Sequence, residues 1–284
     1  TKEQKLMTLY ISRHMDSIES KRIKELSEKR YLNDYEDREM KKLRDLLEQR
    51  VIKESNVVFS TLDSSGKSSI VKNIGQISTL IVDEATLSVE SSMIIPLSLL
   101  PDRFVLVGDQ KQLGPQPSFT ELRKEGYYYS MFERIIKEKS CLKNSVMLNV
   151  QYRMHPIISA LPNRLFYDME LIDGVRPEER IISSKFSMQK HFNFININGV
   201  EEKNGTSYIN TEEICNVVKF VNSLIESGVQ SSQIGVISAY GAQTHVISEN
   251  FKTDGIRVKV STIDSFQGSQ KDYIIICTTR NGSN

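Results

Sequence analysis

The sequence contains no tryptophan, three cysteines and seven prolines among its 284 residues. Cys141, Cys215 and Cys277 are far apart and lack the close pairing of zinc ligands, so neither a disulfide framework nor a zinc module is indicated. No apolar run approaches the length that crosses a bilayer, and the polar start is not a secretory signal. Because 37 Lys and Arg balance 36 Asp and Glu, any polyanion-binding surface must be a local patch. We therefore expect a cytoplasmic or nuclear protein.

The first fifty residues contain neither proline nor glycine and carry 13 Lys or Arg beside 11 Asp or Glu. Apolar residues such as Leu43, Leu47 and Val51 recur at three- to four-residue spacing, which predicts a long helical segment or a helix pair. We interpret residues 1–54 as a solvated helical stalk that can also bind protein regulators. A basic arm that grips phosphates is the weaker alternative, because the segment carries charges of both signs.

From residue 56 onward, short apolar runs alternate with helical stretches. This alternation predicts parallel sheets and therefore an α/β fold. The chain divides into a first domain at 55–145 and a second at 146–284, where the pattern restarts after the apolar run 146–148. The predicted strands lie near 57–59, 80–82, 104–107, 191–198, 234–237, 258–260 and 273–277, with a helix over about 211–227.

Two strings stand at the ends of strand-like runs, DEAT at 83–86 and GDQKQLGP at 108–115. In open α/β sheets, ligands lie at the carboxyl ends of the strands. There Asp83 can coordinate magnesium, and Glu84 can activate a water aimed at a terminal phosphate. Gln112 can hydrogen-bond a phosphate oxygen or a water. An Asp-Glu pair at a strand end also caps helices, so by itself it does not establish catalysis.

Two further strings belong to the second unit. VQYRMHP at 150–156 offers Arg153, whose guanidinium suits a transferring phosphoryl group, and Tyr152, which can stack on a base. A surface ion pair and core packing are the alternatives for these two residues, while His155 before a proline is typical of a helix start. The segment STIDSFQGSQKD at 261–272 suits phosphates or sugars, or is a polar loop.

The strings as a set resemble the superfamily-one helicases of the up-frameshift and senataxin group. In chain order they are DEAT, GDQKQLGP, SMFERI at 130–135, VQYRMHP, GTSYIN at 205–210, ISAYGAQ at 237–243 and STIDSFQGSQKDYIII at 261–276. The resemblance runs from about residue 56 to the C-terminus. It implies two RecA-like domains of the P-loop NTPase type that hydrolyse ATP with Mg²⁺ in their cleft and translocate 5′ to 3′ on single-stranded RNA or DNA. The stalk is more similar to the senataxin members of this group, whereas residues 113–115 and 205–208 are more similar to its up-frameshift members.

The resemblance also implies roles for single positions. Glu84, Gln112 and Arg153 are the expected catalytic residues, and Asp83 is the expected magnesium ligand. This sequence departs from the family at Gln270, where the family usually has an acidic residue that contacts the ribose. The remaining expected cofactor contacts are Asp109, Tyr152 and Gly268, and the expected nucleic-acid contacts are Ser60, Thr61, Pro115, Tyr240, Gln243, Ser261 and Thr262.

A P-loop enzyme needs a glycine-rich loop that ends in Gly-Lys-Ser or Gly-Lys-Thr. The candidate at 66–68 has Thr61 where the first glycine is required, and only 16 residues separate its lysine from Asp83. The resemblance assigns this stretch to nucleic-acid contact instead. We therefore expect the true P-loop upstream of this chain and the last arginine motif downstream, so that the isolated chain hydrolyses little ATP. The alternative function is a non-hydrolysing helicase-like module that binds nucleic acid or a protein.

Overall fold

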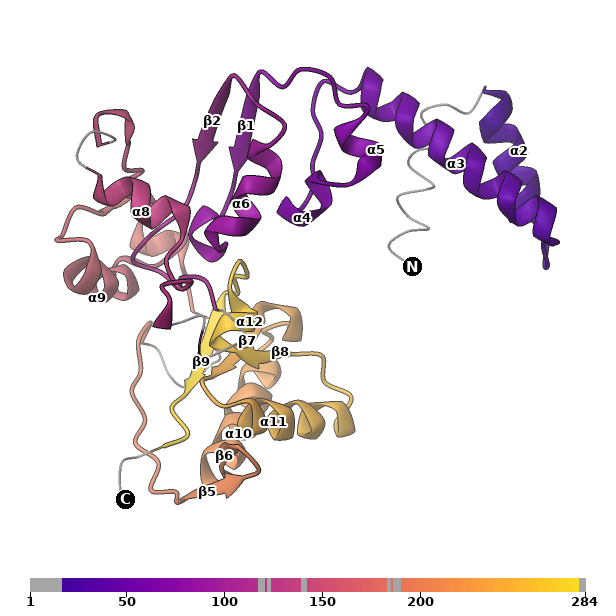
Figure 1. Ribbon diagram of the computed structural model, residues 1–284. Coiled ribbons are helices and arrows are strands. Elements are labelled where there is room, and N and C mark those ends of the chain that lie inside the picture. The colour runs from indigo at the N-terminus through magenta and orange to yellow at the C-terminus, as the bar shows by residue number, and fades with distance from the viewer. Residues whose placement is uncertain are drawn as a thin grey trace. The chain divides into compact units, whose positions relative to one another are not determined.

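The computed structural model describes residues 17–116, 121, 124–138, 142–182, 185 and 190–280. The chain divides into two compact units, residues 1–145 and 146–284. Strands and helices alternate in both, which confirms the predicted α/β fold (Figure 1). The cysteine at position 141 lies outside the described residues.

The first unit begins with a helix pair, α2 (Ile18–Ser27) and α3 (Asp34–Glu54). Asn33 starts α3 in a capping box with Glu36, because each side chain accepts from the other residue's backbone N–H. The two helices share a small apolar core, and Arg22 of α2 pairs with Glu39 of α3 at 2.9 Å. Arg50 of α3 also pairs with Glu19 of α2 at 3.0 Å, so ion pairs as well as apolar contacts link the two helices.

The apolar run at 57–59 is not the strand that its composition predicts. Val57 and Phe59 are 67% and 94% exposed, and the described residues offer no strand to pair with them. A β-strand needs a ladder partner, which an apolar run of three residues cannot specify by itself. Two short helices follow, α4 (Leu62–Ser65) and α5 (Ser68–Val71).

The sheet of the first unit consists of two parallel strands, β1 (Thr79–Val82) and β2 (Arg103–Leu106), with Val82 opposite Leu106 (Figure 1). A 3₁₀ turn, η1 (Ala85–Leu87), and helix α6 (Glu90–Leu97) connect the strands. Helix α8 (Met131–Lys137) completes the core, followed by the turn η2 (Leu142–Asn144). The buried side chains of this core are Val82, Ala85, Met93, Met131 and Phe132.

The second unit contains a three-stranded parallel sheet in the order β8-β7-β9 and two small two-stranded sheets. The strand predicted at 191–198 does not form, and Phe194 is 83% exposed. The apolar run 146–148 is likewise outside any strand, with Leu148 83% exposed. The elements in chain order are β3 (Val150–Gln151), α9 (Pro156–Phe166), β4 (Ile172–Asp173), η3 (Pro177–Glu179), β5 (Glu201–Asn204), β6 (Ser207–Asn210), α10 (Thr211–Glu226), η4 (Ser231–Gln233), β7 (Ile234–Ser238), α11 (Gly241–Thr253), β8 (Lys259–Thr262), α12 (Ile263–Phe266) and β9 (Tyr273–Cys277).

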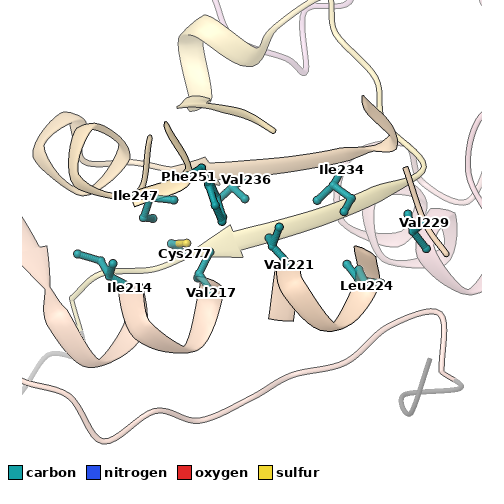
Figure 2. Close-up of a cluster of buried hydrophobic side chains, with 10 residues drawn as sticks. All are labelled: Ile214, Val217, Val221, Leu224, Val229, Ile234, Val236, Ile247, Phe251 and Cys277. Atoms are coloured by element: carbon teal, nitrogen blue, oxygen red, sulfur yellow. The ribbon is translucent and has the colours of Figure 1, made fainter. Parts of the chain in front are cut away.

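The core of the second unit lies between the three-stranded sheet and helices α10 and α11 (Figure 2). Val221 of α10, Val236 of β7 and Ile247 of α11 are fully buried there. Apolar residues recur along α10 at helical spacing, so one face of the helix covers the sheet. Burial raises the pKa of the Cys277 thiol to about 12, with the nearby Glu213 carboxylate adding to the shift.

Candidate functional site

The DEAT and GDQKQ strings lie side by side at one edge of the first sheet. The Val107 N–H donates to the Val82 carbonyl and the Ala85 N–H donates to the Val107 carbonyl, each at 2.8 Å. The two strings therefore leave the carboxyl ends of neighbouring parallel strands, where open α/β sheets bind their ligands. The side chains of Asp83 and Glu84 are exposed at this edge.

Glu84 has an unusual backbone conformation, with φ 51° and ψ 40° in the left-handed region. A non-glycine residue costs about 1–3 kcal/mol in such a conformation, which persists only where the surroundings hold it. Here the Glu84 N–H donates to Oδ1 of Asp83 at 3.0 Å, and the Leu87 N–H donates to the Glu84 carbonyl at 3.0 Å. The two carboxylates are thus set by a strained turn rather than by regular secondary structure.

Gly108 allows the second string to approach this turn closely. A Cβ at position 108 would lie 3.1 Å from Cγ2 and 3.2 Å from the backbone N of Thr86. The hydroxyl of Thr86 is buried and has no hydrogen-bond partner among the described residues. Any larger residue at 108 must push the DEAT turn away from the strand end.

Asp109 orders the loop that carries Gln112. Its Oδ1 accepts from the Lys111 N–H at 2.9 Å, and its Oδ2 accepts from Nε2 of Gln112 at 2.8 Å. Asp109 therefore holds the amide nitrogen of the Gln112 side chain. The side-chain oxygen Oε1 of Gln112 is left as the group that can accept a further hydrogen bond.

The second unit holds the other two strings together. Nε of Arg153 donates to Oε1 of Gln270 at 3.0 Å, although 117 residues separate them. Both side chains are exposed, and no described carboxylate forms an ion pair with Arg153. The guanidinium is consequently held in place by a neutral amide and keeps its positive charge unpaired.

Tyr152 and Arg153 follow the short strand β3, whose Gln151 braces them. The Gln151 amide accepts from the N–H groups of Arg153 (2.9 Å) and Met154 (2.7 Å) and donates to Oδ1 of Asp173 at 2.7 Å. Tyr152 is 67% exposed, so the structure gives no support to the interpretation that its ring packs in the core. The ion-pair interpretation of Arg153 finds no described partner either.

His155 begins helix α9, as its position before a proline predicts. Its Nδ1 accepts from the Ile157 N–H at 3.1 Å, and its ring stacks on that of His191 with centroids 3.7 Å apart. Burial and the neighbouring His155 lower the pKa of His191.

The expected nucleic-acid contacts differ in how accessible they are. Ser60 and Thr61 are exposed, and Thr61 caps α4. Tyr240 is half-buried, with its ring edge-on to Tyr208 at 5.6 Å between centroids. In the 261–272 segment, Gly268 is exposed with φ 70°. Thr262 caps α12, and the buried Ser261 hydroxyl has no partner in the described part of the chain.

Two expected contacts are corrected by their burial. Gln243 is 0% exposed and uses both ends of its side chain within the protein, since Nε2 donates to Glu213 at 2.8 Å and Oε1 accepts from the Asn210 N–H at 2.9 Å. Pro115 is also buried. Neither side chain can touch a nucleic-acid strand in this structure. The family resemblance implied the contact at Gln243, and the sequence did not reveal its burial because the partners that satisfy the amide lie 30 and 33 residues away.

Sequence reasoning missed the buried network to which Gln243 belongs. Glu213 accepts from the N–H groups of Thr278 and Thr279, each at 2.9 Å, and Thr279 has φ 65°. Asn210 caps α10 by accepting from the Glu213 N–H at 3.1 Å. The Asn-x-x-Glu spacing is a capping signature that could have identified one part of this network.

The candidate P-loop at 66–68 does not form a phosphate cradle. Gly66 ends α4 and Lys67 starts α5, whereas a P-loop joins a strand to the N-terminus of a long helix. Lys67 is exposed. The structure supports the assignment of this stretch away from nucleotide phosphates.

A metal at this site would depend on one carboxylate. The described residues contain no group of three or more His, Cys, Asp or Glu placed to hold an ion. Mg²⁺ is commonly held by one or two carboxylates together with substrate phosphates and waters, so Asp83 at the strand end fits it.

Among the described helices, none is long and apolar enough to cross a membrane.

Comparison with known proteins supplies a family context. A family model described as an AAA domain matches residues 127–284, more than half of the chain, and a second model of the same description matches 3–116. The chain is 33% identical over 266 residues to a regulator of nonsense transcripts 1 homolog of Neurospora crassa. It is 33% identical over 250 residues to the ATP-dependent helicase NAM7 of Saccharomyces cerevisiae, and 32% over 261 residues to the helicase sen1 of Schizosaccharomyces pombe.

These alignments cover 89%, 82% and 87% of this chain, in the same order. They cover 24%, 25% and 15% of the three relatives. The chain therefore spans about a quarter or less of the length of these curated relatives.

Proposed function

Because this chain belongs to the up-frameshift and senataxin group of superfamily-one helicases, we propose that its units are RecA-like domains of an ATP-driven motor. The observation that carries the proposal is that the four strings come together two by two, one pair in each unit. Asp83 and Gly108 lie at one sheet edge, and Arg153 and Gln270 are hydrogen-bonded in the second unit. In this proposal the two half-sites bind one ATP between them.

The first half-site handles the terminal phosphate and the attacking water. Asp83 holds Mg²⁺, which when bound neutralises phosphate charge. Glu84 takes the proton of the water, and its strained turn keeps the carboxylate at the strand end. Gln112, fixed by Asp109, contacts the γ-phosphate or the water through its free carbonyl oxygen.

The second half-site contributes a positive charge and a base contact. Arg153 has two guanidinium nitrogens available beyond the Nε that Gln270 holds, which suits bidentate phosphate binding. Tyr152 stacks on the adenine through its exposed ring. Gly268 and Gln270 lie on the loop next to the nucleotide. At Gln270 a neutral amide replaces the family's acidic residue, so any sugar contact there is a neutral hydrogen bond.

We assign the strand contact to Ser60, Thr61, Tyr240, Ser261 and Thr262. Movement is 5′ to 3′ on a single strand, and RNA is the favoured substrate because relatives are named as regulators of nonsense transcripts. We also propose a role in RNA processing or decay, in the cytoplasm or the nucleus. The helix pair of residues 18–54 is available to protein regulators.

The proposal is tested with the full-length protein and with the 284-residue chain side by side. We expect ATP hydrolysis that single-stranded RNA stimulates in the full-length protein, and little hydrolysis by the chain alone. Duplexes with a 5′ or a 3′ overhang, in RNA and in DNA, then report direction and sugar preference. ATP binding without turnover in the full-length protein would favour the rival function, a non-hydrolysing binding module.

A further inference from the structure

We propose that Arg180 is a positioning residue for the nucleotide contacts of Tyr152 and Arg153. This inference rests on the proposed function, because it concerns how the second half-site is held. Arg180 lies 27 and 28 residues from the groups it binds and belongs to none of the strings described above.

The Arg180 guanidinium binds three backbone carbonyls in succession. Nη2 donates to the Tyr152 carbonyl at 2.6 Å, Nε donates to the Arg153 carbonyl at 3.0 Å, and Nη1 donates to the Glu179 carbonyl at 3.0 Å. Among the described residues, no carboxylate forms an ion pair with it. Its planar fork of donors is thus used on the main chain of the Tyr-Arg pair.

This clamp matters because residues 152–154 are not held by regular secondary structure. Gln151 accepts from the N–H groups of Arg153 and Met154, while Arg180 donates to the carbonyls of Tyr152 and Arg153. Backbone polar groups outside a ladder need such partners. Since the Tyr152 and Arg153 side chains are exposed, the orientation of their main chain decides where ring and guanidinium stand.

Close contact with Gly174 also defines the position of the Tyr152 ring. A Cβ at position 174 would lie 2.4 Å from Cε1 and 2.7 Å from Cδ1 of the Tyr152 ring. Gly174 has no positive φ, so alanine fits its backbone and the ring must move instead. Gly174→Ala therefore displaces Tyr152 by a route that leaves the Arg180 bonds untouched.

The experiment compares Arg180→Gln, Arg180→Lys and Gly174→Ala in the full-length protein by steady-state ATPase kinetics with saturating oligo-uridine. Arg176→Gln is the matched control, because Arg176 lies in the same segment and its guanidinium pairs with Glu179 at 3.8 Å. We expect Arg180→Gln to lower kcat/KM for ATP about tenfold or more, since misplacement of a contact by an ångström has effects of this size. Arg180→Lys does not rescue it, because an ammonium cannot span two carbonyls as a fork.

Inhibition by inorganic tripolyphosphate separates the two contacts. Gly174→Ala should lower the affinity for ATP and leave the affinity for tripolyphosphate unchanged, because only ATP carries a base that Tyr152 can contact. Arg180→Gln should lower the affinity for both. The melting temperatures of the variants report any loss of folding, which would not produce this split. If the wild type turns over ATP and Arg180→Gln equals Arg176→Gln, the positioning role is wrong. If the wild type neither binds nor hydrolyses ATP, the proposed function and this inference both fail.

Discussion

The buried amide of Gln243 offers the sharpest test of the packing in the second unit. Gln243→Leu keeps a side chain of similar volume and removes the hydrogen bonds to Glu213 and to the Asn210 N–H. The leucine cannot form either bond, and residue 243 is 0% exposed, so water cannot replace them. The substitution therefore leaves a buried carboxylate with one donor fewer and a backbone N–H without its acceptor.

The expected loss is large for one residue. A hydrogen bond to a charged group contributes about 1.5–3 kcal/mol, and a buried N–H left without an acceptor costs about 1–3 kcal/mol. The added apolar burial of leucine offsets about 1 kcal/mol. We expect the free energy of unfolding of the second unit to fall by about 3 kcal/mol, equivalent to about 10 °C in melting temperature.

Urea denaturation of the 284-residue chain measures this change. Gln76→Leu is the control, because Gln76 is exposed and bonds the exposed Asp102 at 3.2 Å, so its loss should cost no more than about 0.5 kcal/mol. A loss below about 1 kcal/mol for Gln243→Leu would refute the network as a structural device. Gln243 would then again be a candidate for strand contact.

Two further results follow from the structure. Gly108→Ala should lower ATP turnover in the full-length protein, because its Cβ must displace the neighbouring DEAT turn; unchanged kcat and KM would contradict the close approach. The lowered pKa of His191 means that protonation of this ring is disfavoured in the folded state. The free energy of unfolding is therefore highest above about pH 6.5 and falls as the pH drops below that value. The urea midpoint should drop between pH 7.5 and 5.5, and His191→Phe should reduce that drop; an equal drop in both proteins would exclude the histidine.

The sequence predicts the parts of this chain whose signals are local. The apolar runs before Asp83 and Gly108 become the parallel strands β1 and β2, as continuous aliphatic stretches predict, although Ile81, Phe104 and Val105 are exposed in this structure. The run at 57–59 fails because its composition cannot supply a ladder partner.

The supports of the candidate site could not be predicted in the same way. Arg180 and Gln270 act on the Tyr-Arg pair across 27 to 117 residues, and no periodicity or short motif encodes such a contact. The burial of Gln243 depends likewise on partners from other elements. Long-range hydrogen bonds to exposed or buried polar side chains emerge only when the fold brings their elements together.

Glu84→Gln in the full-length protein tests the assignment of the hydrolytic site most directly. Glutamine keeps the size of the side chain and cannot take the proton of a water, so ATP affinity should stay within about threefold while kcat falls about 10²–10⁴-fold. Glu90→Gln is the matched control, because Glu90 lies six residues on and pairs with Arg134 at the surface. The measurement combines equilibrium ATP binding with RNA-stimulated turnover. Retained binding with lost turnover is the predicted result, and turnover equal to that of Glu90→Gln would contradict the role of Glu84.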